Sequence, residues 1–196
     1  SRNAQAFGTD SKITDSYSGI AVGTDSTVSS SDYGVAIGGD SVVAHGSYGG
    51  IAVGADAEAN GNYARAAGYN ATAKGENSSA VGTNALANGS NAYAYGSNSQ
   101  ASGTNAYASG IDSSVSGRNV QAFGTDADAF GTNATTMGVF ANSVGTNVTA
   151  VIKDPSVTLP VGLYRHDKET QSTSPTKLLS YAQAIRDPRT CKLPAA

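Results

Sequence analysis

Residues 84–97 read Asn-Ala-Leu-Ala-Asn-Gly-Ser followed by Asn-Ala-Tyr-Ala-Tyr-Gly-Ser, one seven-residue pattern written twice. The pattern has Asn or Asp first, small residues second and fourth, glycine sixth and often Ser or Thr last. Glycine recurs at this spacing without a break from Gly54 to Gly145. Earlier glycines at 8, 23 and 38 are spaced by 15, and Gly38 and Gly54 by 16. The chain is therefore a repeat protein, and the repeat decides its fold.

A seven-residue period can also come from a coiled coil, but this sequence excludes one. A coiled coil needs apolar a and d positions and tolerates little glycine. One glycine in every heptad would cost a helix about 1 kcal/mol per copy. Collagen is excluded as well, because it needs glycine at every third residue.

The pattern instead predicts one short strand and one tight turn in each heptad. Positions two to five alternate small and variable residues, which is the period of a β-strand. The Gly-Thr-Asn group that follows suits a turn, because glycine adopts positive φ freely and Asn tolerates it. Small residues at positions two and four are expected to fill a narrow lumen. The predicted turn glycines include Gly68, Gly82, Gly96, Gly110 and Gly124.

A second period of fourteen residues is visible in the residue before each glycine. In alternate heptads this residue is apolar, and in the intervening heptads it is mostly polar. Each coil therefore has two strands, one facing apolar surface and one facing water. The polar set, expected in solvent, includes Lys74, Asn88, Ser102 and Ser116. The apolar set, expected to form one stripe, includes Val22, Ile37, Val53, Val81, Tyr95, Phe123 and Met137.

The apolar stripe predicts association between chains. A lumen of alanine buries little area, at about 25 cal/mol per Å². Ordering seven residues costs roughly 10 kcal/mol. Because the stripe lies outside the lumen, it must be buried against another copy, and a stripe repeated along an axis suits cyclic symmetry. About ten coils of about 4.8 Å each predict a rod of about 48 Å.

Composition and charge narrow the class of protein. The 196 residues include 24 glycines and no Trp, and 39% are hydrophobic, with alanine the most frequent of these. Residues 1–150 carry five Lys/Arg and eleven Asp/Glu, whereas residues 151–196 carry seven and four. No basic stripe suggests nucleic acid, and no long apolar run predicts insertion into a membrane. The first residue, Ser1, opens no signal-like segment, so we expect a processed or excised chain, or one subunit of an assembly. One cysteine, Cys191, excludes an intrachain disulfide framework.

The repeats resemble a known family at particular residues. Gly-Val-Ala-Ile-Gly-Gly-Asp-Ser at 34–41 is similar to the head repeat of YadA-type trimeric autotransporter adhesins, and residues 19–26 and 50–57 echo it. The strict heptads from Gly54 onward resemble the haemagglutinin-type heptapeptide repeats of the same heads. The resemblance covers about residues 1–150. It implies an all-β fold, a trimeric left-handed parallel β-roll of 14–16-residue coils, with the stripe at the threefold axis.

The same resemblance implies a function. Such heads work as homotrimers outside the cell, on the bacterial outer surface, and attach to a host protein or glycan. The stalk and membrane anchor that follow these heads do not match this sequence, so a structural or attachment fibre of a virion, such as a phage tail or capsid fibre, or another extracellular filament is the alternative. The ligand cannot be read from these residues.

Residues 151–196 predict a different module, because all five prolines fall there and the glycine ladder stops before it. Ser174-Pro175 and Asp187-Pro188 bracket a candidate short helix near 175–187. This segment is expected to cap the open end of the roll or to dock onto a stalk or particle protein.

The sequence favours no enzyme, metal or cofactor. His45 and His166 lie in different modules, and no Ser/His/Asp arrangement follows from spacing. Asp126 and Asp128 could suggest the paired carboxylates of a glycosidase, but acidic turn residues are common in these repeats. The nonapeptide of calcium-binding β-helices is absent. Tyr93, Tyr95 and Tyr107 are expected to pack between chains, and Tyr17, Tyr33 and Tyr48 could contact a ligand.

Overall fold

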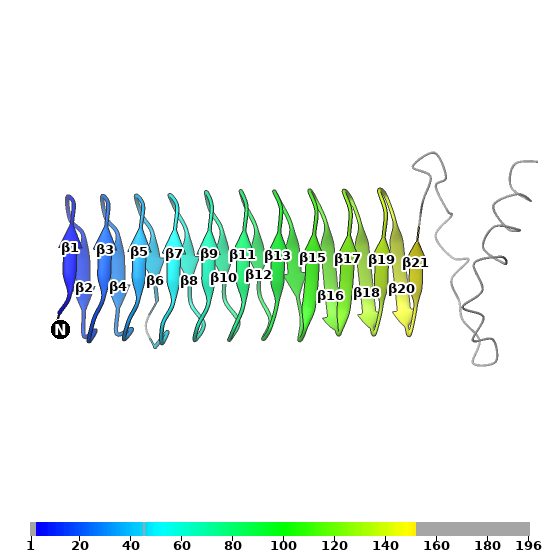
Figure 1. Ribbon diagram of the computed structural model, residues 1–196, viewed down its shortest axis with the longest axis horizontal. Coiled ribbons are helices and arrows are strands. Elements are labelled where there is room, and N and C mark those ends of the chain that lie inside the picture. Colours follow the sequence, from blue (N-terminus) through cyan, green and yellow to red (C-terminus); the bar gives the residue numbers. More distant parts are fainter. Residues whose placement is uncertain (1–2, 45, 152–196) are drawn as a thin grey trace, which may run out of the picture.

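The computed structural model describes residues 3–44 and 46–151, which form a β-solenoid of two parallel sheets (Figure 1). The chain alternates between the sheets, so that each coil contributes one strand to each. The solenoid predicted from the repeat, with about 14-residue coils, is confirmed.

The sheet of odd-numbered strands, here called the odd sheet, has eleven strands in chain order. They are β1 (Gln5–Phe7), β3 (Ile20–Val22), β5 (Val35–Ile37), β7 (Ile51–Val53), β9 (Arg65–Ala67), β11 (Ser79–Val81), β13 (Tyr93–Tyr95), β15 (Ala106–Ser109), β17 (Val120–Phe123), β19 (Thr135–Met137) and β21 (Thr149–Val151).

The other sheet, here called the even sheet, has ten strands, also in chain order. They are β2 (Lys12–Thr14), β4 (Thr27–Ser29), β6 (Val42–Val43), β8 (Glu58–Ala59), β10 (Thr72–Ala73), β12 (Leu86–Ala87), β14 (Gln100–Ser102), β16 (Ser114–Arg118), β18 (Asp128–Thr132) and β20 (Asn142–Thr146).

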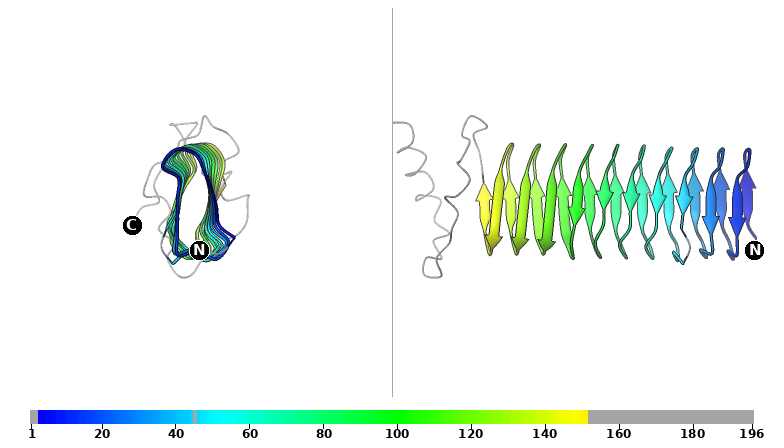
Figure 2. Two further views of the ribbon diagram at one scale, coloured as in Figure 1. Left: turned by 90° about the vertical axis from the view of Figure 1, so that its left-hand side faces the viewer. Right: turned by 180° about the vertical axis from the view of Figure 1, so that it is seen from behind.

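The coil length changes in one kind of turn only. In the later coils Ala80 pairs with Ala94, fourteen residues on, whereas Ala36 pairs with Ala52, sixteen residues on. The added residues lie where the chain passes from the even to the odd sheet, between β6 and β7 for example. The coils therefore stay superimposed along the rod (Figure 2).

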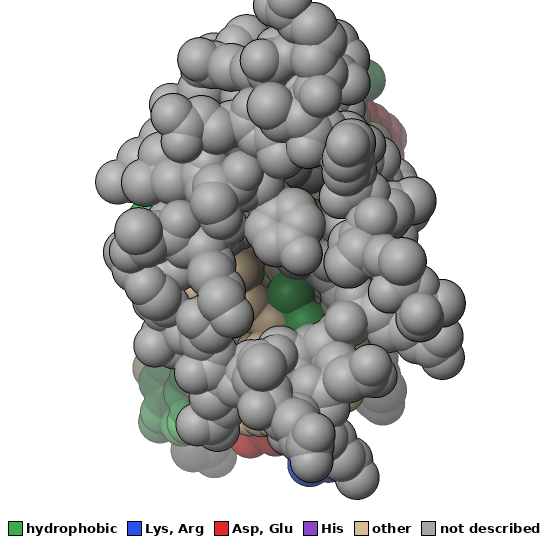
Figure 3. Space-filling view, turned by 90° about the vertical axis from the view of Figure 1, so that its right-hand side faces the viewer, with side chains coloured by type: hydrophobic (Ala, Val, Ile, Leu, Met, Phe, Trp, Pro, Cys, Tyr) green, Lys and Arg blue, Asp and Glu red, His purple; other side chains and the backbone are tan. Residues whose placement is uncertain are grey.

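The lumen is filled by small side chains, as predicted from positions two and four. Ala80, Ala87, Ala94 and Ala101 have no exposed surface. The space-filling view onto the β21 end shows a few hydrophobic side chains near its middle, between atoms drawn in grey (Figure 3). Because these side chains are so short, the two sheets can lie close together.

The lumen also accepts valine, which is larger than the Ala and Ser at most of its positions. Val28 and Val43 are fully buried there, and later Val115 and Val120 are too. In the early coils a glycine makes the room. A Cβ on Gly34 would lie 2.8 Å from a methyl of Val28, and one on Gly50 would lie 2.9 Å from a methyl of Val43.

The turns from the odd to the even sheet explain the Asn and Asp at position one. In residues 68–71 the amide of Ala71 donates to the carbonyl of Gly68, and Asn70 has φ 53°. Positive φ at the third residue is required in type II turns, and Asn and Asp accept it. The side chains then stack: the Asn70 amide donates to Asn84 at 3.0 Å, and that of Asn84 donates to Asn98 at 3.1 Å.

The glycine ladder has a second cause besides positive φ. Gly68, Gly82, Gly96, Gly110 and Gly124 all have φ between 127° and 147°. At Gly75 and Gly89 no positive φ occurs, yet a Cβ would lie within 2.0 Å of the carbonyl oxygen of the next glycine in the stack. Glycine is therefore required at this position because the backbones of neighbouring coils approach closely, and not only because of its φ angle.

The predicted C-terminal module, including the candidate helix near 175–187, lies outside the described residues. So do Cys191, His166 and His45. Within residues 3–44 and 46–151, no helix is long and apolar enough to span a membrane.

Candidate functional site

The structure brings the seven predicted interface residues together on one face. They occupy one column on the outside of the odd sheet, as the register of Val22 with Ile37 and of Phe123 with Met137 shows. Ile37, Val53, Val81 and Met137 are exposed in the single chain, and Val22, Tyr95 and Phe123 are half-buried. We call this column the apolar stripe.

A second outward column runs beside the stripe, two residues before it on each odd strand. Ile20, Val35 and Ile51 continue the apolar face there, and Tyr93 and Tyr107 follow further along. The two columns together make an outer face with very little charge. Among the eleven odd strands Arg65 is the one charged residue, whereas the even strands carry Lys12, Glu58, Arg118 and Asp128.

The polar set predicted to face solvent lies on the even side. Lys74, Asn88 and Ser116 are exposed and Ser102 is half-buried. Two later members of that column, Phe130 and Val144, are apolar, and Val144 is 54% exposed. The distinction between the two faces is therefore clearest in the first eight coils.

Two aromatic groups lie on the surface. On the odd sheet, Tyr107 packs against Phe123 with ring centroids 5.2 Å apart and against Tyr95 at 5.7 Å. On the even-to-odd turns, Tyr17, Tyr33, Tyr48 and Tyr63 form a continuous column with neighbouring centroids 5.4–6.0 Å apart. Sequence reasoning identified the first three of these tyrosines and missed Tyr63, because Tyr63 precedes Ala-Arg-Ala and not a Gly-Ile-Ala or Gly-Val-Ala unit.

Asp32 and Asn62 hold this tyrosine column in place. The amide of Tyr17 donates to a carboxylate oxygen of Asp32 at 2.8 Å, and the amide of Tyr48 donates to the side-chain oxygen of Asn62 at 2.8 Å. Burial raises the pKa of Tyr48, and the adjacent Tyr33 and Tyr63 add to the rise. The phenol of Tyr48 therefore remains neutral over the physiological pH range.

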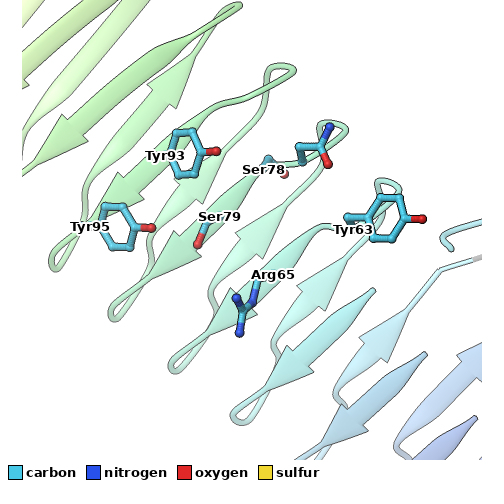
Figure 4. Close-up of a pocket in the computed structure, with 7 residues that line it drawn as sticks. Tyr63, Arg65, Ser78, Ser79, Tyr93 and Tyr95 are labelled. Atoms are coloured by element: carbon cyan, nitrogen blue, oxygen red, sulfur yellow. The ribbon is translucent and has the colours of Figure 1, made fainter. Parts of the chain in front are cut away.

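A shallow hollow interrupts the odd face at Arg65 (Figure 4). Arg65 is followed in its column by Ser79, and the next outward residue on its own strand is Ala67. Both are small, whereas tyrosines and aliphatic residues occupy the surrounding positions. The hollow is lined by Tyr63, Arg65, Asn77, Ser78, Ser79, Tyr93 and Tyr95.

The described part of the chain contains no group of three or more metal-ligating side chains. Asp126 and Asp128 lie two residues apart and are close enough to interact electrostatically. Burial raises the pKa of the Asp128 carboxyl, Asp126 raises it further, and a backbone hydrogen bond from Ser114 lowers it. Neither carboxyl lines the hollow around Arg65.

The raised pKa of Asp128 predicts a small pH dependence of stability. A carboxyl whose pKa is higher in the folded state stabilises the fold below its unfolded pKa, and loses that contribution as pH rises through the folded pKa. We expect Asp128→Asn to raise the melting temperature at pH 7 by no more than a few degrees, and to lose this advantage below about pH 4.

Circular dichroism melts of the Asp128→Asn variant at pH 3 to 8 would measure this effect. The matched control is Asp15→Asn, an exposed carboxylate at the other end of the rod. An equal gain for Asp128→Asn at pH 3 and pH 7 would contradict the linkage.

Comparison with known families agrees with this geometry. A family model described as the YadA head domain repeat matches residues 66–85, 80–99, 87–106 and 101–127. No curated protein sequence matches the chain significantly. The matched segments begin and end within the uninterrupted 14-residue coils, where the alanine lumen, the glycine stack and the Asn ladders all occur. Residues 66–127 therefore carry YadA-like head repeats.

Proposed function

We propose that this chain is the head of a trimeric extracellular fibre that mediates attachment by multivalent display, without catalysis. The observation that carries the proposal is the apolar stripe on a face with one charge. A long exposed apolar surface on a soluble protein marks an interaction site. Because the stripe position is apolar in nearly every coil, three copies related by a threefold axis can bury the stripe along the whole rod.

The trimer leaves the even sheets and many of the turns available for ligands. YadA-like heads are displayed on bacterial surfaces, which supports an extracellular location and a host protein or glycan as the ligand. Three identical faces on one rigid rod raise avidity without strong single sites. On these turns, Tyr17, Tyr33 and Tyr48, in the coils before the hollow around Arg65, are candidate contacts for such a ligand.

Light scattering tests the trimer directly. The full chain, of 19.5 kDa, is expected to have a mass of three chains. Charge on the stripe, as in the double variant Val81→Lys with Met137→Lys, should dissociate the trimer, because buried unpaired charges are costly. The matched control, Asn88→Lys with Ser116→Lys on the even side, should remain trimeric. A stable wild-type monomer would overturn the proposal.

Attachment is tested by retention of coated beads on cultured epithelial cells and on matrix-coated surfaces. Beads that carry the trimer should be retained, and beads with an equal mass of the Val81→Lys, Met137→Lys variant should be lost on washing. Equal retention of both would show that attachment does not depend on multivalent display.

A further inference from the structure

We propose that Tyr69 of each protomer inserts into the hollow around Arg65 of the next protomer, so that three such contacts close the ring. The proposal rests on the proposed trimer and names a contact within it. Each copy supplies one knob, which is the side chain of Tyr69, and one hollow, and the two lie on opposite edges of the roll.

Tyr69 stands out among the odd-to-even turns. The second residue of these turns is small, polar or aliphatic in every other coil, for example Thr9, Ala55, Thr83 and Ile111. Among the turns within residues 3–151, Tyr69 is the one aromatic residue at that position, and it is 58% exposed. A large aromatic ring is placed in solvent at a turn where threonine is the most frequent residue.

The hollow lies on the other edge and has complementary chemistry. Tyr63, Asn77 and Ser78 come from even-to-odd turns, and Arg65 is exposed at the adjoining end of β9. No acidic side chain within residues 3–44 and 46–151 forms an ion pair with Arg65, so its guanidinium is available to a partner. An aromatic face is a good partner for Arg, and tyrosine rings on the walls can pack edge to face with another ring.

The heights of the two features match. Tyr69 lies between Arg65 and Ser79 in the chain, and these two residues are paired one coil apart. A coil rises about 4.8 Å, so the knob and the hollow lie within one coil of each other along the rod. Cyclic symmetry rotates copies about the axis without moving them along it, and therefore brings a knob level with a hollow.

The direction of the contact also fits a cyclic trimer. If three odd sheets face one axis, the even-to-odd edge of one protomer meets the odd-to-even edge of the next. Contacts of this kind join two different surfaces and close into a ring when the rotation allows. A knob and a hollow on opposite edges satisfy that requirement, whereas a twofold dimer would place identical edges together.

Cross-linking tests the contact. In the full chain with Cys191→Ser, the pair Tyr69→Cys and Arg65→Cys is expected to give covalent dimers and trimers with a short bifunctional maleimide, seen on a denaturing gel. The maleimide replaces direct oxidation because a tyrosine ring packed on an arginine side chain keeps the two Cα atoms beyond the reach of a disulfide. A link within one chain leaves the mass of a single chain and is not scored. The control pair, Thr9→Cys with Arg65→Cys, differs in height by four coils and should give no such products.

Removal of the knob gives a second measurement. Tyr69→Thr is expected to raise the concentration at which the trimer dissociates at least tenfold, whereas Ile111→Thr, at the same turn position, should change it less than twofold. Arg65→Gln should act in the same direction, and the double variant should add little to Tyr69→Thr. A trimer without cross-linked products and with unchanged dissociation in Tyr69→Thr would overturn this contact alone. A wild-type monomer would overturn the proposed function.

Discussion

Gly117→Ala is expected to lower the stability of the rod by about 4 kcal/mol, an effect that single substitutions rarely reach. Gly117 has φ +134°, a backbone conformation that residues other than glycine rarely adopt. A Cβ there would lie 1.8 Å from the carbonyl oxygen of Gly131 and 2.8 Å from its carbonyl carbon. Because the obstacle is backbone inside a continuous ladder, it can move only if hydrogen bonds between β16 and β18 break.

Thermal unfolding followed by circular dichroism measures this effect, and a fall in melting temperature of about 10 °C is expected. The matched control is Gly39→Ala. Gly39 has no positive φ, its added Cβ would find its nearest atom at 3.9 Å, and Ala55 occupies the corresponding position one coil later. Similar melting temperatures for Gly117→Ala and Gly39→Ala would show that neighbouring coils can move apart at Gly117 without a loss of folding free energy.

The loss of stability caused by Gly117→Ala should be greatest in the coils next to Gly117. In a solenoid each coil contacts only the coils beside it, so stability is close to a sum of local terms. A break at Gly117 separates the coils before it from those after it. Hydrogen exchange should therefore quicken first at Gly117 and Gly131 and last at β3, and a uniform increase along the rod would contradict this local account.

The repeat predicted the backbone path well, because every coil gives the same information. The alternation of Ala85 and Ala87 with outward residues marks the strand, and the Asn and Gly on either side mark the turns. The register follows from the period, since residues fourteen apart must stack. For the same reason the two faces of the roll, and the residues of the apolar stripe, could be read from the residue before each glycine.

Features that depend on pairs of residues in different coils could not be read in this way. The clash that requires glycine at Gly89 involves the carbonyl of Gly103, and only the stacked geometry reveals it. The room that Gly34 leaves for Val28 is a contact across the lumen. The hollow at Arg65 arises because Ser79, fourteen residues later, is small. Each case depends on how two coils superimpose, which a pattern within one heptad does not contain.

The lumen provides the other large expected effect, because it has no room for a longer side chain. Ala94 has no exposed surface and pairs with Ala80 below and Ala108 above. Ala94→Leu would add three carbons between the odd sheet and the even sheet. Each sheet is held in place by backbone hydrogen bonds to the coils on either side. We expect a loss of about 3 kcal/mol, at the upper end of typical overpacking, and a fall in melting temperature of about 5–10 °C.

The control for Ala94→Leu is Thr72→Leu, which adds leucine to the outside of the even sheet. Thr72 pairs with Leu86, so a leucine at this outward position already occurs one coil later, and we expect a change of no more than about 0.5 kcal/mol. The early coils support the same reasoning, because Val28 is accommodated where Gly34 lacks a side chain. The 14-residue coil at Ala94 has Ala92 in the place of that glycine, and Ala92 is itself fully buried. Equal melting temperatures for Ala94→Leu and wild type would mean that the two sheets can separate locally, and the narrow lumen would then not limit which residues the repeat accepts.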